Sequence, residues 1–272
     1  MVERRRQLWR HVGLIVGLAI LLFPLIWTLF SSLESSSHAA SFPGSLIPQF
    51  HYQNYVHAWE AAPWGRYFFN TILIATLTTA LVLITSLGAA YAFGMHEFPG
   101  KRVLFWLVLS VLMIPTELNI IPQYLLFADL HWLNTYQVQI IPWAASTFGI
   151  FLIRQFVMSL PRDLFDAARI DGAGELAILW HVVAPLVIPA LVTVGVYVFL
   201  GSYNAFLWPL IVTNGHAVRP IEVGLASFRT ANNSEYTQLS AAAVFTTLPV
   251  LVFFLIAQRY IVESISRTGV RG

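Results

Sequence analysis

The chain has 272 residues, of which 57% are hydrophobic and only 10% are charged, whereas an average soluble domain carries about a quarter of its residues as Asp, Glu, Lys or Arg. A soluble fold of this size would need far more polar residues to cover its surface, so the composition excludes that class and indicates an integral membrane protein. The 15 basic and 13 acidic residues nearly cancel without forming a basic stripe, which argues against a nucleic-acid partner, and the absence of Cys excludes disulfides and thiol chemistry.

Six apolar stretches are long enough to cross the hydrocarbon core of a bilayer, which takes about 20 helical residues. They lie at 11–33, 70–93, 103–127, 138–158, 182–212 and 239–262. The gaps between them are too short to hold a soluble domain. We therefore predict one all-helical transmembrane domain over residues 1–272, a bundle of six transmembrane helices.

The first stretch also fits a cleaved signal peptide, because Arg4 to Arg10 precede it and Ala39-Ala40 follow it. Its apolar run, however, is longer than the roughly 7–15 residues of a signal-peptide core. We therefore count it as a retained span.

The basic residues fall mainly on one side of the predicted spans. With the amino terminus in the cytoplasm, 12 of the 15 Lys and Arg residues are cytoplasmic, and only Arg66, Arg219 and Arg229 are not. Lys and Arg in short loops are retained on the cytoplasmic side. Both termini are therefore predicted to be cytoplasmic.

Prolines gather in the third and fifth spans. A proline disturbs the backbone hydrogen bonds of a helix, and broken helices are tolerated in membranes where they line a cavity. Any single proline is also compatible with an ordinary kink. Because of their concentration, we predict that these two spans wall a pathway. The residues concerned are Pro115, Pro122, Pro185, Pro189, Gly201 and Pro209.

The segment 159–181 is too polar to cross a membrane. Pro161 and Asp163 are typical of a first helical turn, and Gly172 is typical of the position just past a helix end. These signals predict a short helix, a turn and a second short helix. Such a segment suits the groove of another protein, but its chemistry alone favours a helix that lies on lipid.

Within this segment, Asp166-Ala167-Ala168 is followed by Gly172 and, after nine more residues, by the tetrapeptide 182–185 with sequence Val-Val-Ala-Pro. This arrangement resembles the signature of permease subunits of bacterial ATP-binding-cassette importers, Glu-Ala-Ala, three residues, Gly, nine residues and Ile-x-Leu-Pro. The spacing is preserved, and the three replacements keep charge or apolarity. The resemblance runs from about residue 66 to the end. It is closest to the carbohydrate-uptake branch, in particular the second permease of maltose-type and glycerol-phosphate-type importers.

In that family the signature loop forms a coupling helix that docks in a cleft of the ATP-hydrolysing subunit. The resemblance therefore implies a cytoplasmic coupling-helix loop, a bacterial inner-membrane location and a set of partners. These are a homologous second permease, two ATP-binding subunits that hold ATP and Mg, and an extracytoplasmic substrate-binding protein. The residues that would contact the ATPase are Asp166, Ala167, Ala168, Asp171, Gly172 and Ala173.

The chain itself shows no ATP site. Gly94 and Gly100-Lys101-Arg102 come nearest to a phosphate-binding loop, but five residues separate the glycines where four are needed, and Arg replaces the Ser or Thr. We therefore expect that a partner hydrolyses ATP and that this chain holds no cofactor and no metal.

Polar and aromatic side chains cluster inside the third and fifth spans. A carboxylate at the bilayer centre costs about 2.5–3.5 kcal/mol on insertion scales and usually faces a cavity. Hydroxyl, amide and aromatic groups together suit a sugar, although they can also bond one another or sister helices. The candidate substrate-pathway residues are Glu117, Asn119, Ser202, Tyr203, Asn204 and Trp208.

The predicted function is that of a permease subunit in an ATP-driven importer, with a sugar, an oligosaccharide or glycerol phosphate as possible solutes. An intramembrane enzyme with Glu117 or a His as its base is a weaker alternative, because the chain has no Gly-x-Ser-x-Gly motif and no metal-binding spacing. An ion channel would not need the signature loop. The polar segments 34–69 and 213–238 are predicted to be loops or contacts for the binding protein.

Overall fold

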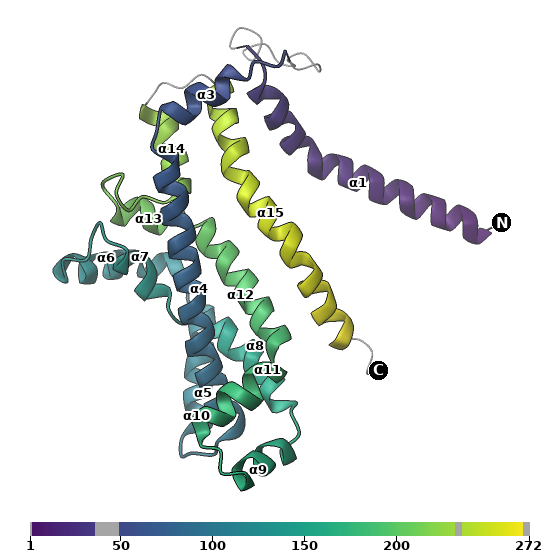
Figure 1. The fold of residues 1–272 in the computed structure, drawn as a ribbon, viewed down its shortest axis with the longest axis vertical. Coiled ribbons are helices and arrows are strands. Elements are labelled where there is room, and N and C mark those ends of the chain that lie inside the picture. Colours follow the sequence, from purple (N-terminus) through teal and green to yellow (C-terminus); the bar gives the residue numbers. More distant parts are fainter. Residues whose placement is uncertain (1, 36–48, 232–235, 269–272) are drawn as a thin grey trace. The chain divides into compact units, whose positions relative to one another are not determined.

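The computed structural model describes residues 2–35, 49–231 and 236–268. Within these ranges every regular element is a helix (Figure 1), which confirms the predicted all-helical class. Helices Trp9–Ser32, Trp64–Met95 and Tyr236–Ile256 are each long and apolar enough to cross a membrane. Three bent helix pairs raise the number to six if each pair is one span, which agrees with the predicted bundle.

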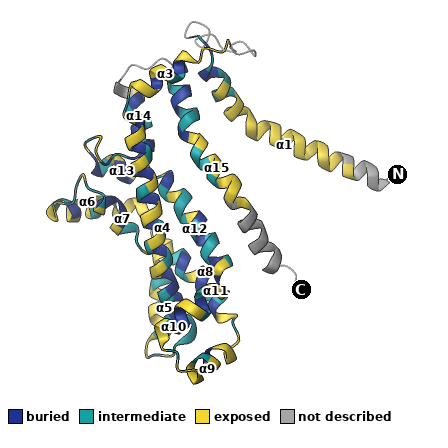
Figure 2. Ribbon diagram, in the orientation of Figure 1, coloured by how far each residue is buried: buried dark blue, intermediate teal, exposed yellow. Residues whose placement is uncertain are grey.

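The chain divides into two compact units, and the first combines Met1–Trp64 with Gly224–Pro249. Its helices are α1 (Val2–Ser32), α3 (Gln53–Glu60), most of α14 (Ile221–Ala231) and the first part of α15 (Tyr236–Thr268). Asn54 ties α3 to the end of α1, because its Nδ2 donates to the carbonyls of Ser32 and Glu34 at 2.9 and 2.8 Å. Most of α1 is exposed (Figure 2), so it offers an apolar surface to surrounding lipid or protein.

The second unit combines Gly65–Val223 with Val250–Gly272 and holds both candidate sites. Its longer helices are α4 (Trp64–Met95), α5 (Lys101–Ser110), α6 (Ile120–Asp129), α8 (Thr147–Met158), α9 (Asp163–Ile170) and α12 (Ile188–Tyr203). Its shorter helices are η1 (Val111–Met113), η2 (Thr116–Asn119), α7 (Gln137–Ile140), η3 (Ile141–Trp143), α10 (Glu175–Ile178), η4 (Leu179–Val183), α11 (Ala184–Leu186) and α13 (Leu207–Val212).

Three of the predicted spans are bent rather than straight. The third turns by 95° between Met113 and Thr116, the fourth by 42° between Trp143 and Thr147, and the fifth by 81° at Val187. In the third span the residue before Pro115 has an extended backbone, as expected from the steric restriction that a proline imposes on its predecessor. A further break at residues 204–206 separates α12 from α13, so the predicted stretch 182–212 is not one continuous helix.

Helices α4, α8 and α12 approach one another closely around the core of this unit. A Cβ placed on Gly149 of α8 would lie 2.7 Å from the Ser86 Oγ of α4 and 3.1 Å from a methyl group of Val194 of α12. Small residues allow membrane helices to pack in this way. The core also includes buried side chains from the segment between α8 and α12, namely Phe165, Ile178, Leu179 and Val183.

Candidate functional site

The first candidate site is the signature segment, which contains α9, a turn and α10, as predicted. Asp163 and Asp166 lie in the first turn of α9 and Arg169 lies in the last. This distribution complements the partial charges at the two helix ends. Phe165 is only 1% exposed and packs in the core of the unit, which also holds side chains of α4, α8 and η4. It therefore fixes α9 to this core.

Gly172 ends α9 in a left-handed conformation, with φ of 82°. Its N–H donates to the Arg169 carbonyl at 3.0 Å, and the next N–H, of Ala173, donates to the Ala168 carbonyl at 2.9 Å. These two bonds form a Schellman motif, which satisfies the last carbonyls of a helix and favours Gly at this position. The glycine of the signature therefore sets the direction in which the chain leaves α9.

The predicted coupling residues divide between two faces of this segment. Asp166, Ala167, Asp171 and Gly172 are exposed, whereas Ala168 and Ala173 are partly buried and pack against the core. Two apolar side chains that were not among the candidates are also exposed, Ile170 at 86% and Leu176 at 74%. Ile170 and Leu176 are apolar residues beside charged ones, which could have marked them as contact residues. The sequence alone does not show that their side chains are exposed.

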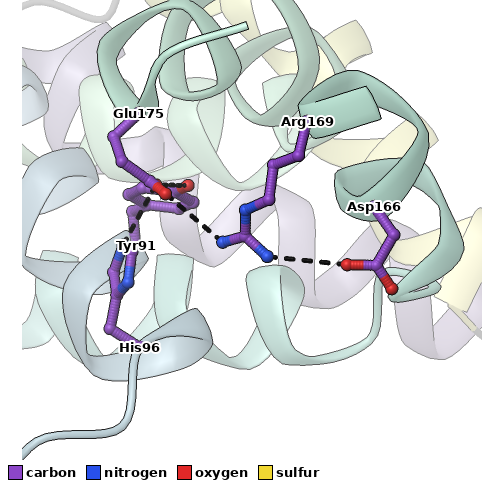
Figure 3. A network of polar contacts seen from close by, with 5 residues as sticks. All are labelled: Tyr91, His96, Asp166, Arg169 and Glu175. Atoms are coloured by element: carbon purple, nitrogen blue, oxygen red, sulfur yellow. Dashed lines mark hydrogen bonds and ion pairs between the residues drawn. The ribbon is translucent and has the colours of Figure 1, made fainter. Parts of the chain in front are cut away.

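A chain of polar contacts connects the surface of α9 to the end of α4 (Figure 3). Glu175 lies at its centre and accepts hydrogen bonds from the Tyr91 hydroxyl at 2.5 Å and from Arg169 Nη2 at 3.3 Å. The His96 Nε2 lies 3.3 Å from the same carboxylate. Arg169 Nη1 in turn lies 3.5 Å from Asp166 Oδ1. We call these five residues the α4–α9 network.

The hydroxyl of Tyr91 is the main cause of a lowered pKa at Glu175, with further contributions from His96 and Arg169. The carboxylate is therefore ionised at neutral pH. The Arg169 and Glu175 side chains are about half exposed, and exposed ion pairs add little to stability. Tyr91 is buried, so its hydrogen bond is the contact of the network that fixes the position of the Glu175 carboxylate.

The second half of the signature contains a local distortion of the helix. Pro185 has no N–H to bond the carbonyl of His181, four residues earlier. The π-helical turn η4 directly precedes α11, and its wider turn lets the Ala184 N–H donate to the Leu179 carbonyl five residues back. The proline of the signature thus explains why this turn is π-helical, a feature that is frequent at functional sites.

The second candidate site is a cavity of about 370 Å³ inside the second unit. The breaks in the third, fourth and fifth spans all contribute to its wall. Side chains of α4, α7 and α12 complete it. Irregular backbone at membrane depth is tolerated where it lines a cavity. The cavity therefore explains why the spans can be broken at these points. The wall includes Thr71, Thr78, Glu117, Gln139, Trp143, Ser146, Ser202, Phe206 and Trp208.

Three of the six predicted pathway residues, Glu117, Ser202 and Trp208, line this cavity. The other three do not. Tyr203 is buried away from it, at 2% exposure, and Asn119 and Asn204 are exposed elsewhere on the unit. The indole Nε1 of Trp208 donates to the Val138 carbonyl at 2.8 Å. The Trp208 ring is buried and packs edge-on against Phe127 and Trp143.

Several residues of the wall come from the second and fourth spans, for which the sequence predicts no role in the pathway. The signal was present as hydroxyl and amide side chains inside apolar stretches, at Thr71, Thr78, Gln139 and Ser146. Each of these polar residues lies among apolar neighbours, so the sequence alone did not single it out. Which of these side chains face a common space depends on helix rotation, which is set by packing.

The start of the segment 213–238 is fastened to the helices that line the cavity. Side chains of Asn70, Thr71 and Gln139 bond the main chain of residues 217–221 at 2.8–3.1 Å. This part of the segment is a non-helical connection held in place by these hydrogen bonds, and α14 follows it. Residues 232–235 of the same segment, and 36–48 of the segment 34–69, lie outside the described residues.

The comparison with protein families matches residues 63–267 to the family described as "Binding-protein-dependent transport system inner membrane component". The chain belongs to this family. Membership confirms the resemblance carried by the signature segment, together with a transport role in the inner membrane.

Relatives in this family match over nearly the whole chain. The sn-glycerol-3-phosphate transport system permease protein UgpE of Yersinia enterocolitica is 34% identical, covering 97% of this chain and 98% of its own. The arabinooligosaccharides transport system permease protein AraQ of Bacillus subtilis is 33% identical, covering 92% of this chain and 91% of its own. The chain is therefore of the same extent as these permeases.

A solved structure supports the same fold. A chain of a bacterial ABC transporter involved in the import of the acidic polysaccharide alginate matches with a TM-score of 0.84 at 24% identity. It covers 96% of this chain and 98% of that one. At this level of identity the likeness concerns the arrangement of the helices.

Proposed function

We propose that this permease is a pore-forming subunit of an ATP-driven importer for a sugar or an oligosaccharide. The observation that carries the proposal is the signature segment, which forms an exposed helix whose exit is fixed by Gly172 and whose surface is linked to α4. A helix that transmits force needs an accessible face for a motor and a firm attachment to the spans. The segment has both.

The motor would be a separate ATPase. The sequence offers no phosphate-binding loop. ATP and Mg would therefore be bound by two partner subunits. A homologous second permease would complete the pathway, and an extracytoplasmic binding protein would deliver the solute.

The coupling contact would be made by the residues of the segment that face outward, including Asp166, Ala167, Asp171 and Gly172. This contact requires residues 163–180 on the cytoplasmic side, which places both termini there as well. Closure of the two ATPase subunits would then pull on α9, and the α4–α9 network would pass the displacement to the spans. The cavity would open alternately to the two sides of the membrane.

Copurification with ATP-dependent uptake tests the proposal. The tagged permease, expressed with its neighbouring genes and extracted in mild detergent, should bring an ATPase with it. In proteoliposomes the complex should accumulate a solute only when ATP and a loaded binding protein are present. A permease that purifies alone, or that conducts solute without ATP, would instead support an enzyme or a channel.

A further inference from the structure

Helix α3 has one buried side and two exposed sides of different character. Successive residues of an α-helix are rotated by about 100° about its axis. Asn54 and Ala58 therefore share one side, and both are buried. The residues on a second side are polar and exposed, and these are Gln53, His57 and Glu60. One side of α3 is thus fixed against the protein, and the second side suits water.

The third side of α3 is apolar and exposed. Val56 is 46% exposed and Trp59 is 49% exposed, and Tyr52, which directly precedes the helix with helical backbone angles, is 67% exposed. These positions are four and then three residues apart, so they form one stripe. An apolar stripe beside a polar one is typical of a helix that lies in a membrane surface, and Tyr and Trp are enriched at that depth.

The depth of α3 is set by its attachment to two membrane spans. The Asn54 Nδ2 donates to the carbonyls of Ser32 and Glu34, where α1 ends. The Tyr55 hydroxyl is bonded to the Ser32 Oγ at 2.7 Å. Span α4 begins at Trp64, one short turn after the end of α3 at Glu60. Helix α3 therefore lies where one span leaves the membrane and the next one enters it.

The ring of Trp59 also contacts a third span. It lies edge-on to the Phe245 ring of α15, with 5.5 Å between the ring centroids. Phe245 belongs to the stretch Tyr236–Ile256, which is long and apolar enough to cross a membrane. A side chain that contacts a membrane-spanning residue is itself close to the bilayer. The exposed part of the Trp59 ring is therefore in a position to meet lipid.

We propose that α3 is a membrane-surface anchor. Its apolar stripe, Tyr52, Val56 and Trp59, inserts among the lipid headgroups and upper acyl chains, while its polar side faces water. In the proposed topology this is the extracytoplasmic leaflet, and the anchor holds the end of α1 and the start of α4 at a fixed height. The proposal replaces the expectation that this part of the segment 34–69 contacts the binding protein. It depends on the spans and not on the ATPase, so it can fail or hold independently of the importer function.

Spin labels measure the depth of each exposed side. The chain has no Cys, so Val56→Cys and His57→Cys each place one label on it, on the apolar and the polar side. The complex is reconstituted in vesicles of phosphatidylethanolamine and phosphatidylglycerol, and the complex without the added Cys gives the background from its partner subunits. The quantity measured is the collision rate of the label with oxygen, which dissolves in lipid, divided by the rate with a nickel chelate, which stays in water.

We expect this ratio to be several-fold higher at Val56→Cys than at His57→Cys, with or without the binding protein. Equal ratios at the two positions would place both sides in water and overturn the proposal. Low collision rates with both reagents at Val56→Cys would show that protein covers the stripe, and would overturn it as well. If both rates fall only when the binding protein is added, the stripe is a contact for that protein and not for lipid.

Trp59→Gln tests whether the stripe holds the helix at this depth. It removes the largest apolar side chain of the stripe, so the ratio at Val56→Cys should fall several-fold toward that at His57→Cys. Trp59→Phe keeps an aromatic ring and should preserve the ratio. The matched control is Glu60→Gln, which introduces the same residue on the polar side and should change nothing. Identical ratios for Trp59→Gln and Trp59→Phe would contradict the anchor.

Discussion

Gly172 is the residue whose replacement tests the geometry of the signature most sharply. A Cβ at this position would meet no atom within 4 Å, but φ of 82° places the residue in the left-handed region. The cost of Gly172→Ala is therefore conformational, about 1–2 kcal/mol. Gly174 is equally uncrowded and has φ of −74°, so Gly174→Ala is a matched control.

We predict that Gly172→Ala weakens the coupling of ATP hydrolysis to uptake, while Gly174→Ala leaves it close to the native value. Gly172→Asn should be intermediate, because Asn tolerates the left-handed region better than Ala. The measurement is the ratio of solute imported to ATP hydrolysed in proteoliposomes. Equal ratios for the two Ala variants would show that the Schellman motif plays no part in coupling.

The hydrogen bond from Tyr91 to Glu175 should hold α9 in position. Tyr91→Phe keeps the ring, which stands edge-on to His96 at 5.0 Å, but removes the donor that fixes the carboxylate. A spin label at Ile170→Cys should therefore become more mobile in Tyr91→Phe. Tyr197→Phe, at an exposed position, is the control. Unchanged mobility in Tyr91→Phe would contradict a positioning role for the network.

The mobility of the spin label at Ile170→Cys should depend on pH, because the pKa of Glu175 is lowered. A carboxyl group whose pKa is lowered by folding stabilises the structure above its ordinary value of 4.5 and loses that effect as the pH falls through the lowered value. The mobility of the label should thus stay low at neutral pH and rise only in acid. With Glu175→Gln it should be high throughout, and a step that persists in this variant would assign the titration to another group.

At the scale of elements, the sequence predicts the existence of the spans better than their continuity. Long apolar runs specify α1, α4 and α15, since length and composition suffice for a membrane helix. Prolines mark the bends of the third and fifth spans. The bend in the fourth span follows Pro142 of η3. It is also marked by Ser146, whose extended backbone and Oγ bond to the Gly149 N–H begin α8, a capping signal that hydropathy does not reveal.

Only some of the residues that line the cavity could be predicted from the sequence. Glu117, Ser202 and Trp208 could be identified because they interrupt apolar spans in groups. Thr78 and Gln139 could not, because a single polar residue in a span usually bonds its own helix or a neighbour. Their places in the wall of the cavity are set only when three broken spans are assembled around the same space.

The close packing of α4, α8 and α12 gives a prediction for an element. Gly149→Ala would place a methyl group 2.7 Å from the Ser86 Oγ, and overpacking of this kind costs about 1–3 kcal/mol. The thermal midpoint of unfolding in detergent should fall. Gly88→Ala in α4 meets no atom within 4 Å and should leave the midpoint unchanged or raise it. Similar midpoints for both variants would show that the helices do not depend on this contact.

The proposed mechanism depends on the path by which force passes from α9 to the spans. The signature segment is joined to the core of its unit by Phe165 and to α4 through the α4–α9 network, so a pull on α9 moves both together. The breaks in three spans lie around the cavity and allow its wall to change shape. A motor at one end can therefore alter the access of a solute without touching it.

The most direct measurement of this claim places a photocrosslinking amino acid at Ile170, which is 86% exposed on α9, in a complex that is hydrolysing ATP in lipid. The comparison position is Leu21 of α1, which is 75% exposed in an apolar span. We predict that Ile170 crosslinks to the ATPase subunit and that Leu21 does not. If Ile170 reaches only phospholipid during turnover, the segment is a membrane-surface helix and the importer mechanism is wrong.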